Sequence, residues 1–240
     1  MRMRESVLGA IMMLFSVLSA SSATESMTQQ GVGTTKGILK DRLLPEQRQV
    51  WEFIERKVLD EHPTGGPLYP ALRRLWDWAN GTRHQIYIEM PIKAAALSTK
   101  AAQFRIEKYN AEAESYVAVI ELNLAKINEA GICPEAARSN GFIPFNGLST
   151  EERYLEVFAH ELAHALHWLT DSEYARLERE FDAEAAAHHH LLTMKMKRKD
   201  QKAALTRCRA RLATLVKQIE GPAEQTEETI WKELIAARVR

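Results

Sequence analysis

Two histidines and a glutamate occur with the spacing H-E-x-x-H, at His160, Glu161 and His164. On an α-helix, residues four apart lie on the same face one turn apart, so the two imidazoles can bind one metal ion. Glu161 lies roughly 100° around the helix axis from His160. From there its carboxylate can reach a metal-bound water without binding the metal itself. The spacing therefore predicts a zinc site with Glu161 as the general base.

The residues around this motif predict the helix that such a site requires. Apolar side chains recur at spacings of three and four beside the histidine face, at Leu155, Phe158, Leu162, Leu166 and Leu169. Ser149 and Glu152 fit a capping box, so the helix is expected to begin near Thr150. A second capping signal at residues 170–173 indicates that this helix ends near Leu169 and that the chain then turns back.

A third protein ligand is expected, because two histidines alone bind zinc weakly. The candidates are four carboxylates on the next predicted helix: Glu178, Glu180, Asp182 and Glu184. A return helix that starts near Asp171 reaches the metal somewhere in this stretch, and helix geometry alone does not choose among the four. They form two opposite faces, Glu180 with Glu184 and Glu178 with Asp182. Apolar neighbours at 177, 181 and 185 flank the first face more closely, which favours Glu180.

Residues 150–190 resemble the gluzincin branch of zinc metallopeptidases, in which a later helix supplies a ligand Glu with an acidic residue four positions on. Residues 180–184, Glu-Phe-Asp-Ala-Glu, match this pattern except that Glu184 stands in place of Asp. The metzincin continuation fails, because His167 and Thr170 replace its Gly and its third His. The resemblance implies that Glu180 is the third ligand of one zinc ion per chain. It also implies that Glu184 accepts a hydrogen bond from a ligating imidazole.

The rest of the chain predicts an α+β fold that is mainly helical. Strand-like segments at 85–90, 103–109 and 115–123 suggest a small antiparallel sheet, with a turn at 110–114. The resemblance implies a zincin-like arrangement, in which this sheet packs on the motif helix and its edge strand binds an extended peptide. Helices are expected over 45–59 and 68–78, and a loop over 125–145. A basic helix should end at Gly221-Pro222 and be followed by a last helix toward Arg238.

The first 23 residues resemble a secretory signal peptide. An apolar run from Val7 to Ala20 follows basic residues and precedes Ser21-x-Ala23, which suits a cleavage site. The run is shorter than the ~20 residues that span a bilayer, so we expect cleavage near Ala23 and no membrane span afterwards. This predicts a secreted or periplasmic protein, with an uncleaved N-terminal anchor as the alternative. Residues 24–43 are expected to be a flexible linker, and 44–240 a single metallopeptidase-like domain with C-terminal helices.

Charge and cysteine content exclude other classes of protein. Lys plus Arg equals Asp plus Glu at 32 each, so no general attraction to nucleic acid is expected. Basic residues gather between 195 and 211, as on the solvated face of a helix. The two cysteines, Cys133 and Cys208, are too few for a cysteine zinc cluster, and whether they pair is open.

Together these features predict a zinc metallopeptidase that acts on peptide or protein substrates, in which Glu161 takes a proton from the attacking water. The alternative is a non-catalytic zinc-binding protein, such as a folding factor or a metal buffer. His167 lies within about 20° of His160 around the helix and would close the site as a fourth ligand. Three residues are candidates for stabilising an oxyanion: Tyr174, His167 and His188.

Overall fold

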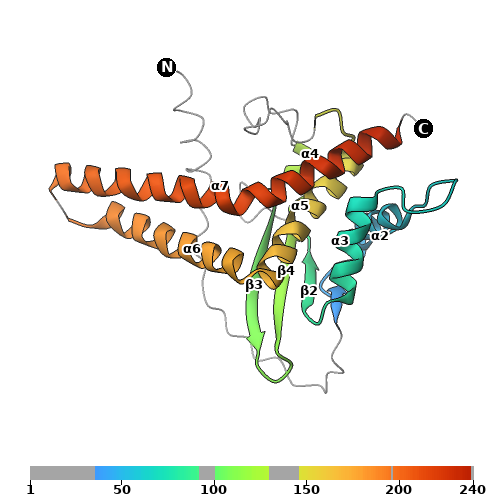
Figure 1. Ribbon diagram of the computed structural model, residues 1–240, viewed down its shortest axis with the longest axis horizontal. Coiled ribbons are helices and arrows are strands. Elements are labelled where there is room, and N and C mark those ends of the chain that lie inside the picture. The colour runs from blue at the N-terminus through green and yellow to red at the C-terminus, as the bar shows by residue number, and fades with distance from the viewer. Residues whose placement is uncertain (1–35, 92–100, 130–145, 196, 239–240) are drawn as a thin grey trace.

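The computed structural model describes residues 36–91, 101–129, 146–195 and 197–238. Their elements, in chain order, are β1 (Gly37–Leu39), α2 (Pro45–Leu59), α3 (Pro70–Gly81), β2 (Gln85–Glu89), β3 (Ala102–Asn110), β4 (Ser115–Leu122), α4 (Leu124–Glu129), α5 (Thr150–Thr170), α6 (Ser172–Thr193) and α7 (Arg198–Ala237). Helix α5 lies between the sheet and the other long helices, and α6 with the first half of α7 forms a hairpin that extends away from them (Figure 1). The predicted α+β class, mainly helical with a small sheet, is confirmed.

The sheet is mixed, so the prediction of an antiparallel sheet is only partly right. Its strand order is β1-β2-β4-β3, with parallel pairs β1–β2 and β2–β4 and one antiparallel pair, β3–β4. The turn at 110–114 makes β3 and β4 neighbours, as predicted. Strand β2, however, pairs with β4 instead of with β3, the next strand in the chain. Sequence signals for a turn specify only the pairing of strands that the turn connects.

The boundaries of the predicted linker also change. Strand β1 lies inside the range 24–43 and pairs with β2, with Ile38 opposite Ile86. The short helix α4 occupies the start of the predicted loop 125–145. The predicted signal peptide, most of the linker and Cys133 lie outside the described residues. Among the helices that are described, none is long and apolar enough to cross a membrane.

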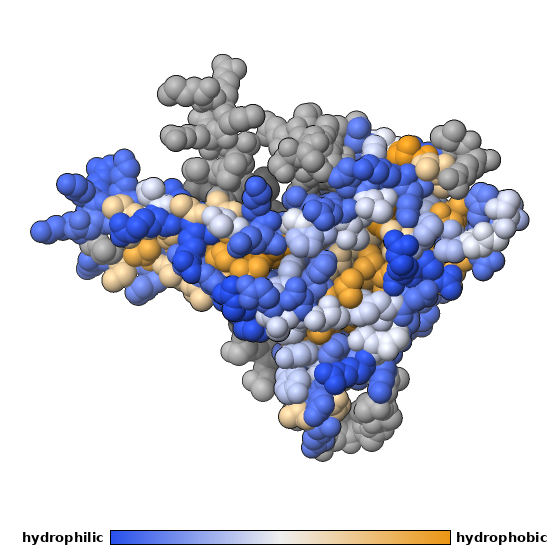
Figure 2. All heavy atoms as spheres, in the orientation of Figure 1, coloured by the Kyte–Doolittle hydropathy of each residue, from blue (hydrophilic) through white to orange (hydrophobic). Residues whose placement is uncertain are grey.

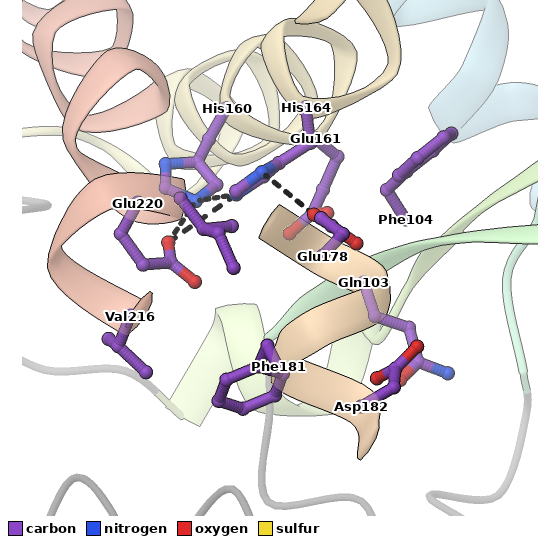
Figure 3. A pocket seen from close by; sticks show the side chains of 11 residues that line it. Gln103, Phe104, His160, Glu161, His164, Glu178, Phe181, Asp182, Val216 and Glu220 are labelled. Atoms are coloured by element: carbon purple, nitrogen blue, oxygen red, sulfur yellow. Dashed lines mark hydrogen bonds and ion pairs between the residues drawn. The ribbon is translucent and has the colours of Figure 1, made fainter. Parts of the chain in front are cut away.

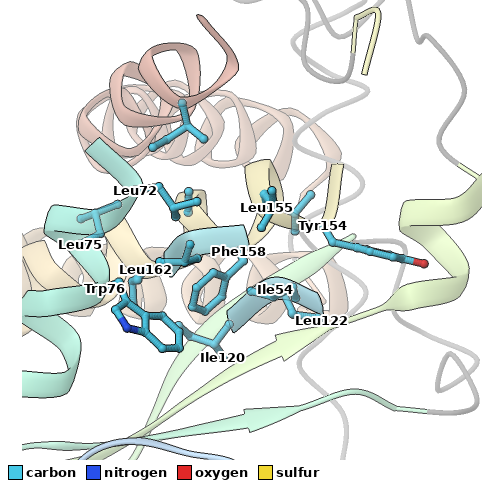
Figure 4. Packing of buried hydrophobic residues seen from close by; sticks show 14 of the residues in the cluster. Ile54, Leu72, Leu75, Trp76, Ile120, Leu122, Tyr154, Leu155, Phe158 and Leu162 are labelled. Atoms are coloured by element: carbon cyan, nitrogen blue, oxygen red, sulfur yellow. The ribbon is translucent and has the colours of Figure 1, made fainter. Parts of the chain in front are cut away.

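Helix α5 is held in place by the apolar face that its sequence predicted. Leu155, Phe158 and Leu162 are buried. The Phe158 ring contacts Trp51 of α2, with ring centroids 5.4 Å apart. It also contacts Trp76 of α3, with ring centroids 6.3 Å apart (Figure 4). The opposite face of α5 is therefore left to carry the histidines.

Both ends of α5 are where the sequence placed them. The Ser149 hydroxyl accepts a hydrogen bond from the Glu152 amide, and the Glu152 carboxylate accepts one from the Ser149 amide. After Thr170 the chain reverses, and the Asp171 carboxylate accepts hydrogen bonds from the first amides of α6. Helix α6 thus returns beside α5, as expected.

Helix α7 is longer than the sequence predicted, because Gly221-Pro222 does not end it. Pro222 lies inside a single helix of 40 residues, and Figure 1 shows the helix changing direction near its middle. Proline lacks the N–H that would bond the carbonyl four residues earlier and displaces that carbonyl, so it bends a helix where packing holds both halves. Leu212 and Leu215 pack the first half against α6, and Ile230 and Leu234 bury the second half in the main core.

Candidate metal centre

Three side chains from two helices meet at one point. The Nε2 atoms of His160 and His164 on α5 are 3.0 Å apart. The Glu220 Oε2 atom, from the middle of α7, lies 3.3 Å from the first and 3.4 Å from the second (Figure 3). Within the described residues these are the His, Cys, Asp and Glu side chains whose ligand atoms converge closely enough to hold one metal ion.

The spacing of these atoms suits a small divalent ion. Tetrahedral coordination with bonds of about 2.0–2.1 Å places ligand atoms about 3.3–3.4 Å apart. The three separations, 3.0, 3.3 and 3.4 Å, are close to that value without rearrangement of the helices. Two imidazoles and one carboxylate can therefore bind the same ion.

Hydrogen bonds behind the histidines assign their tautomers. The His160 Nδ1 atom lies 3.2 Å from the carboxylate of buried Glu227, which can only accept, so Nδ1 carries the proton. The Tyr174 hydroxyl donates to the Ile219 carbonyl at 3.0 Å, so it accepts from the His164 Nδ1 atom. Burial, with nearby carboxylates, raises the pKa of Tyr174, which keeps that hydroxyl protonated. Each ring therefore turns its Nε2 atom toward the point where the three side chains meet, and this nitrogen can bind a metal that displaces a proton from it.

Opposite charges are balanced within the cluster. Burial opposes ionisation of Glu220, but hydrogen bonds from His160 and His164 outweigh it and hold the pKa of Glu220 well below its usual value. Burial likewise disfavours protonation of His160, yet Glu220 and Glu227 raise its pKa well above the usual value. The carboxylates of Glu220 and of buried Glu227, on either side of the His160 ring, favour a positive charge at this point.

The cluster forms one wall of a cavity of about 320 Å³. Glu161 lines it from α5, Gln103 and Phe104 from the edge strand β3, and Phe181 from α6 (Figure 3). Neither lysine nor arginine is among the described residues that line the cavity. Four carboxylates do line it: Glu161, Glu178, Asp182 and Glu220. Glu161, the predicted general base, is thus in the cavity beside the three ligand atoms.

Glu178 is the α6 carboxylate nearest to the histidines, 4.0 Å from the His164 Nδ1 atom. Its burial raises its pKa to about 7, and the neighbouring Asp182, Glu220 and Glu161 act in the same direction against the opposing effect of His164. The face of α6 that carries Glu178 and Asp182 therefore borders the cavity.

The structure does not bring the two residues chosen from the sequence, Glu180 and Glu184, to the histidines. The Glu180 carboxylate pairs with Arg176 and Arg211, and Glu184 lies 3.5 Å from Arg211. The reason is that the apolar residues flanking this face pack against α7: Leu177 packs beside Leu215 and Ile219, and Ala185 beside Cys208 and Leu212. Their apolar character indicated the contact between α6 and α7, not the metal-facing side.

The three candidates for a fourth ligand or an oxyanion donor also lie elsewhere. The His167 ring packs on Tyr174, with centroids 5.4 Å apart, and burial lowers its pKa. The Tyr174 hydroxyl is behind His164, outside the cavity lining. His188 accepts a hydrogen bond from Arg209 at 3.3 Å, within the hairpin.

The sequence did contain a signal for the two residues that were missed. Glu220 and Glu227 are seven apart, which places them two turns apart on one helical face. The Gly-Pro pair at 221–222 predicts a break between two helices, so from sequence Glu220 and Glu227 are not expected to share one helical face.

Comparison with models of known protein families, with curated proteins and with solved structures found no match to this chain. The geometry of the site and the H-E-x-x-H motif are therefore what indicate its chemistry.

Proposed function

We propose that this protein is a zinc-dependent peptidase whose metal is held by His160, His164 and Glu220. The observation that carries the proposal is the convergence of three ligand atoms, with the Nε2 atom of each ring turned toward the others by a hydrogen bond on the far side of the ring. Two imidazoles and one carboxylate are a ligand set typical of catalytic zinc. Three protein ligands leave a coordination position open, as catalysis requires.

Each group has a role in this mechanism. Zinc, when bound, makes a water more acidic and polarises a carbonyl group. Glu161 takes the proton of the attacking water and delivers it to the departing amine. Glu227 and Tyr174 keep the histidines in the tautomer and orientation that binding needs.

The cavity favours a neutral or cationic substrate. Its four carboxylates repel anionic groups, and neither lysine nor arginine is among the described residues that line it. Strand β3 is an edge strand, and its Gln103 and Phe104 border the cavity. An extended peptide that paired with this edge would pass the metal ligands. This is why we propose a peptide rather than a phosphate ester as the substrate.

We also propose that the protein is a zincin-like peptidase of the gluzincin type, on the sequence pattern of residues 150–190. The pattern of residues 1–23 supports a secreted or periplasmic location. In this form Glu220, on a later helix than the one expected, takes the place of Glu180. The alternative, a closed non-catalytic zinc site, needs a fourth protein ligand. His167 was the candidate, and its contact with Tyr174 supports the open site.

The experiment separates metal binding from catalysis. Glu161→Gln keeps all three ligands, so we expect full zinc content by elemental analysis and a fall in peptide hydrolysis of about 100-fold or more. Glu151→Gln, on the exposed first turn of α5, is the matched control and should change neither. A wild-type protein that carries one zinc and cleaves nothing in a broad peptide library would favour the non-catalytic alternative. Undiminished hydrolysis by Glu161→Gln would contradict the mechanism.

A further inference from the structure

The hairpin of α6 and α7 extends away from the rest of the chain (Figure 1). Its interior is apolar near the metal centre, where Tyr174 packs with Leu215 and Ile219, and along its length, where Ala185 packs with Cys208 and Leu212. From Glu178 to the end of α6 at Thr193 the helix is about 22 Å long, at ~1.5 Å per residue. The hairpin therefore holds its tip well away from the cavity.

Two large apolar side chains are exposed at this tip. Leu192 in the last turn of α6 is 50% exposed, and Met194 at its C-cap is 41% exposed. The other exposed large apolar residues of the described chain are Leu44 and Leu59, at opposite ends of α2, and Tyr109 on β3. Only at the tip do two occur together, and burying them would be favourable.

The same tip carries a group of cations that are not neutralised. The exposed side chains are Lys195, Lys197, Arg198, Lys199 and Lys202. One carboxylate, Asp200, lies among them, and no ion pair joins these five cations to other described residues. Closer to the metal centre the basic residues do have partners, since Arg211 pairs with Glu180. Figure 2 shows hydrophilic side chains gathered at this end of the hairpin beside paler, more apolar ones.

We propose that the hairpin tip, residues 192–195 and 197–202, docks on the surface of a bilayer rich in anionic lipid. Leu192 and Met194 would enter the boundary between headgroups and acyl chains, and the five cations would lie at the lipid phosphates. Neither signal is sufficient alone, because stable peripheral binding takes an apolar insertion together with basic charge. The tip supplies both within about ten residues.

Other anionic partners fit this surface less well. Single-stranded nucleic acid is bound by cations interleaved with aromatic rings on which bases stack, and the tip sequence contains no aromatic residue. An acidic protein would satisfy the cations but would need a complementary pocket for two adjacent, protruding apolar side chains. A bilayer accepts them without such a pocket. This inference is independent of the metal centre, so either proposal can fail without the other.

A local probe tests the docking without interference from the apolar N-terminal run. The full chain with Cys133→Ser and Thr193→Cys keeps one other thiol, that of Cys208, which is buried, so an environment-sensitive nitrobenzoxadiazole dye labels residue 193. The labelled protein is titrated with vesicles. We expect a blue shift and a several-fold rise in emission with vesicles containing about 30% phosphatidylglycerol, little change with phosphatidylcholine alone, and loss of the response at about 1 M salt.

Variants then separate the two contributions. Lys197→Glu with Lys199→Glu should weaken the apparent affinity by at least ~10-fold, since each cation near an anionic surface contributes appreciably. Leu192→Ser with Met194→Ser should do the same. Lys108→Glu with Lys217→Glu, which are exposed away from the tip, is the matched control for charge and should have little effect. No response to anionic vesicles, an equal response to neutral vesicles, or a response to nucleic acid alone would overturn the proposal.

Discussion

Replacing Glu220 by Gln should abolish tight metal binding. The substitution keeps the size of the side chain and its place on α7, and removes the negative charge that faces both imidazoles at 3.3 and 3.4 Å. Carboxamide oxygen is a weak ligand for zinc compared with carboxylate. The change therefore leaves only the two histidines as ligands, and two histidines alone bind zinc weakly.

The expected loss of metal affinity can be scaled from residues that orient a metal ligand without binding the metal. Loss of a residue that only orients a ligand costs about 10–100-fold in metal affinity, so loss of a ligand should cost more than ~100-fold. A second effect acts in the same direction. The His160 ring lies between the carboxylates of Glu220 and Glu227, and it would lose one of these two anionic neighbours. Less negative charge beside the imidazoles weakens their attraction for any cation.

The assay is a competition titration of metal-free protein with zinc against a chromophoric chelator. Glu180→Gln is the matched control, because Glu180 was the ligand expected from the sequence and its carboxylate pairs with Arg176 and Arg211. We expect affinity in this control to stay within a few-fold of wild type, since exposed ion pairs contribute little. A severe loss in Glu180→Gln with Glu220→Gln unaffected would refute the structural assignment and restore the interpretation from sequence.

Three further outcomes are expected. Tyr174→Phe should lower zinc affinity by about 10–100-fold in the same titration while the fold is retained, because only the hydroxyl that accepts from His164 is lost. An unchanged affinity would show that Tyr174 does not orient His164 for metal binding. Phe158→Ala should lower the free energy of unfolding by about 3–5 kcal/mol in urea, since the ring is fully buried; a loss below about 1 kcal/mol would contradict the packing. Hydrogen bonds from Arg42 lower the pKa of Glu107 to about 2 from the usual 4.5. This pair therefore stabilises the fold above pH 4.5, and its contribution should be lost as the pH falls toward 2. If the free energy of unfolding of the wild type falls no more steeply over this range than that of Arg42→Gln, the effect is excluded.

The parts of the fold that local signals determine were predictable. The capping box at Ser149, the apolar face of α5 and the reversal after Thr170 all depend on residues within a few positions of one another. The H-E-x-x-H spacing brought His160 and His164 together for the same reason. The pairing of β2 with β4 was not predictable in this way, because it depends on the path of the chain between distant segments.

Apolar residues on α6 do not identify the side of the helix that faces the metal centre. Leu177 and Ala185 flank the face of Glu180 and do pack against a neighbour, but an apolar face does not reveal which neighbour covers it. Helices α6 and α7 both border the cavity, and α6 packs Leu177 and Ala185 against α7 while its acidic residues Glu178 and Asp182 face the cavity. On a helix that packs against one neighbour and lines a polar site on another side, the apolar residues mark the packing face and the polar residues mark the site.

Pro222 shows why the missing ligand came from α7. Proline inside a helix costs about 3 kcal/mol, which makes a helix end the ordinary interpretation of Gly-Pro. Here both halves of α7 bury apolar side chains, Leu212 on one side of the proline and Ile230 on the other, and burial of a few such side chains offsets that cost. Because the helix continues, Glu220 and Glu227 stay on one face on either side of Pro222, and Glu220 meets His160 Nε2 while Glu227 meets its Nδ1. The helix that bends at Pro222 thus supplies both the carboxylate that would bind the metal and the one that orients its first histidine.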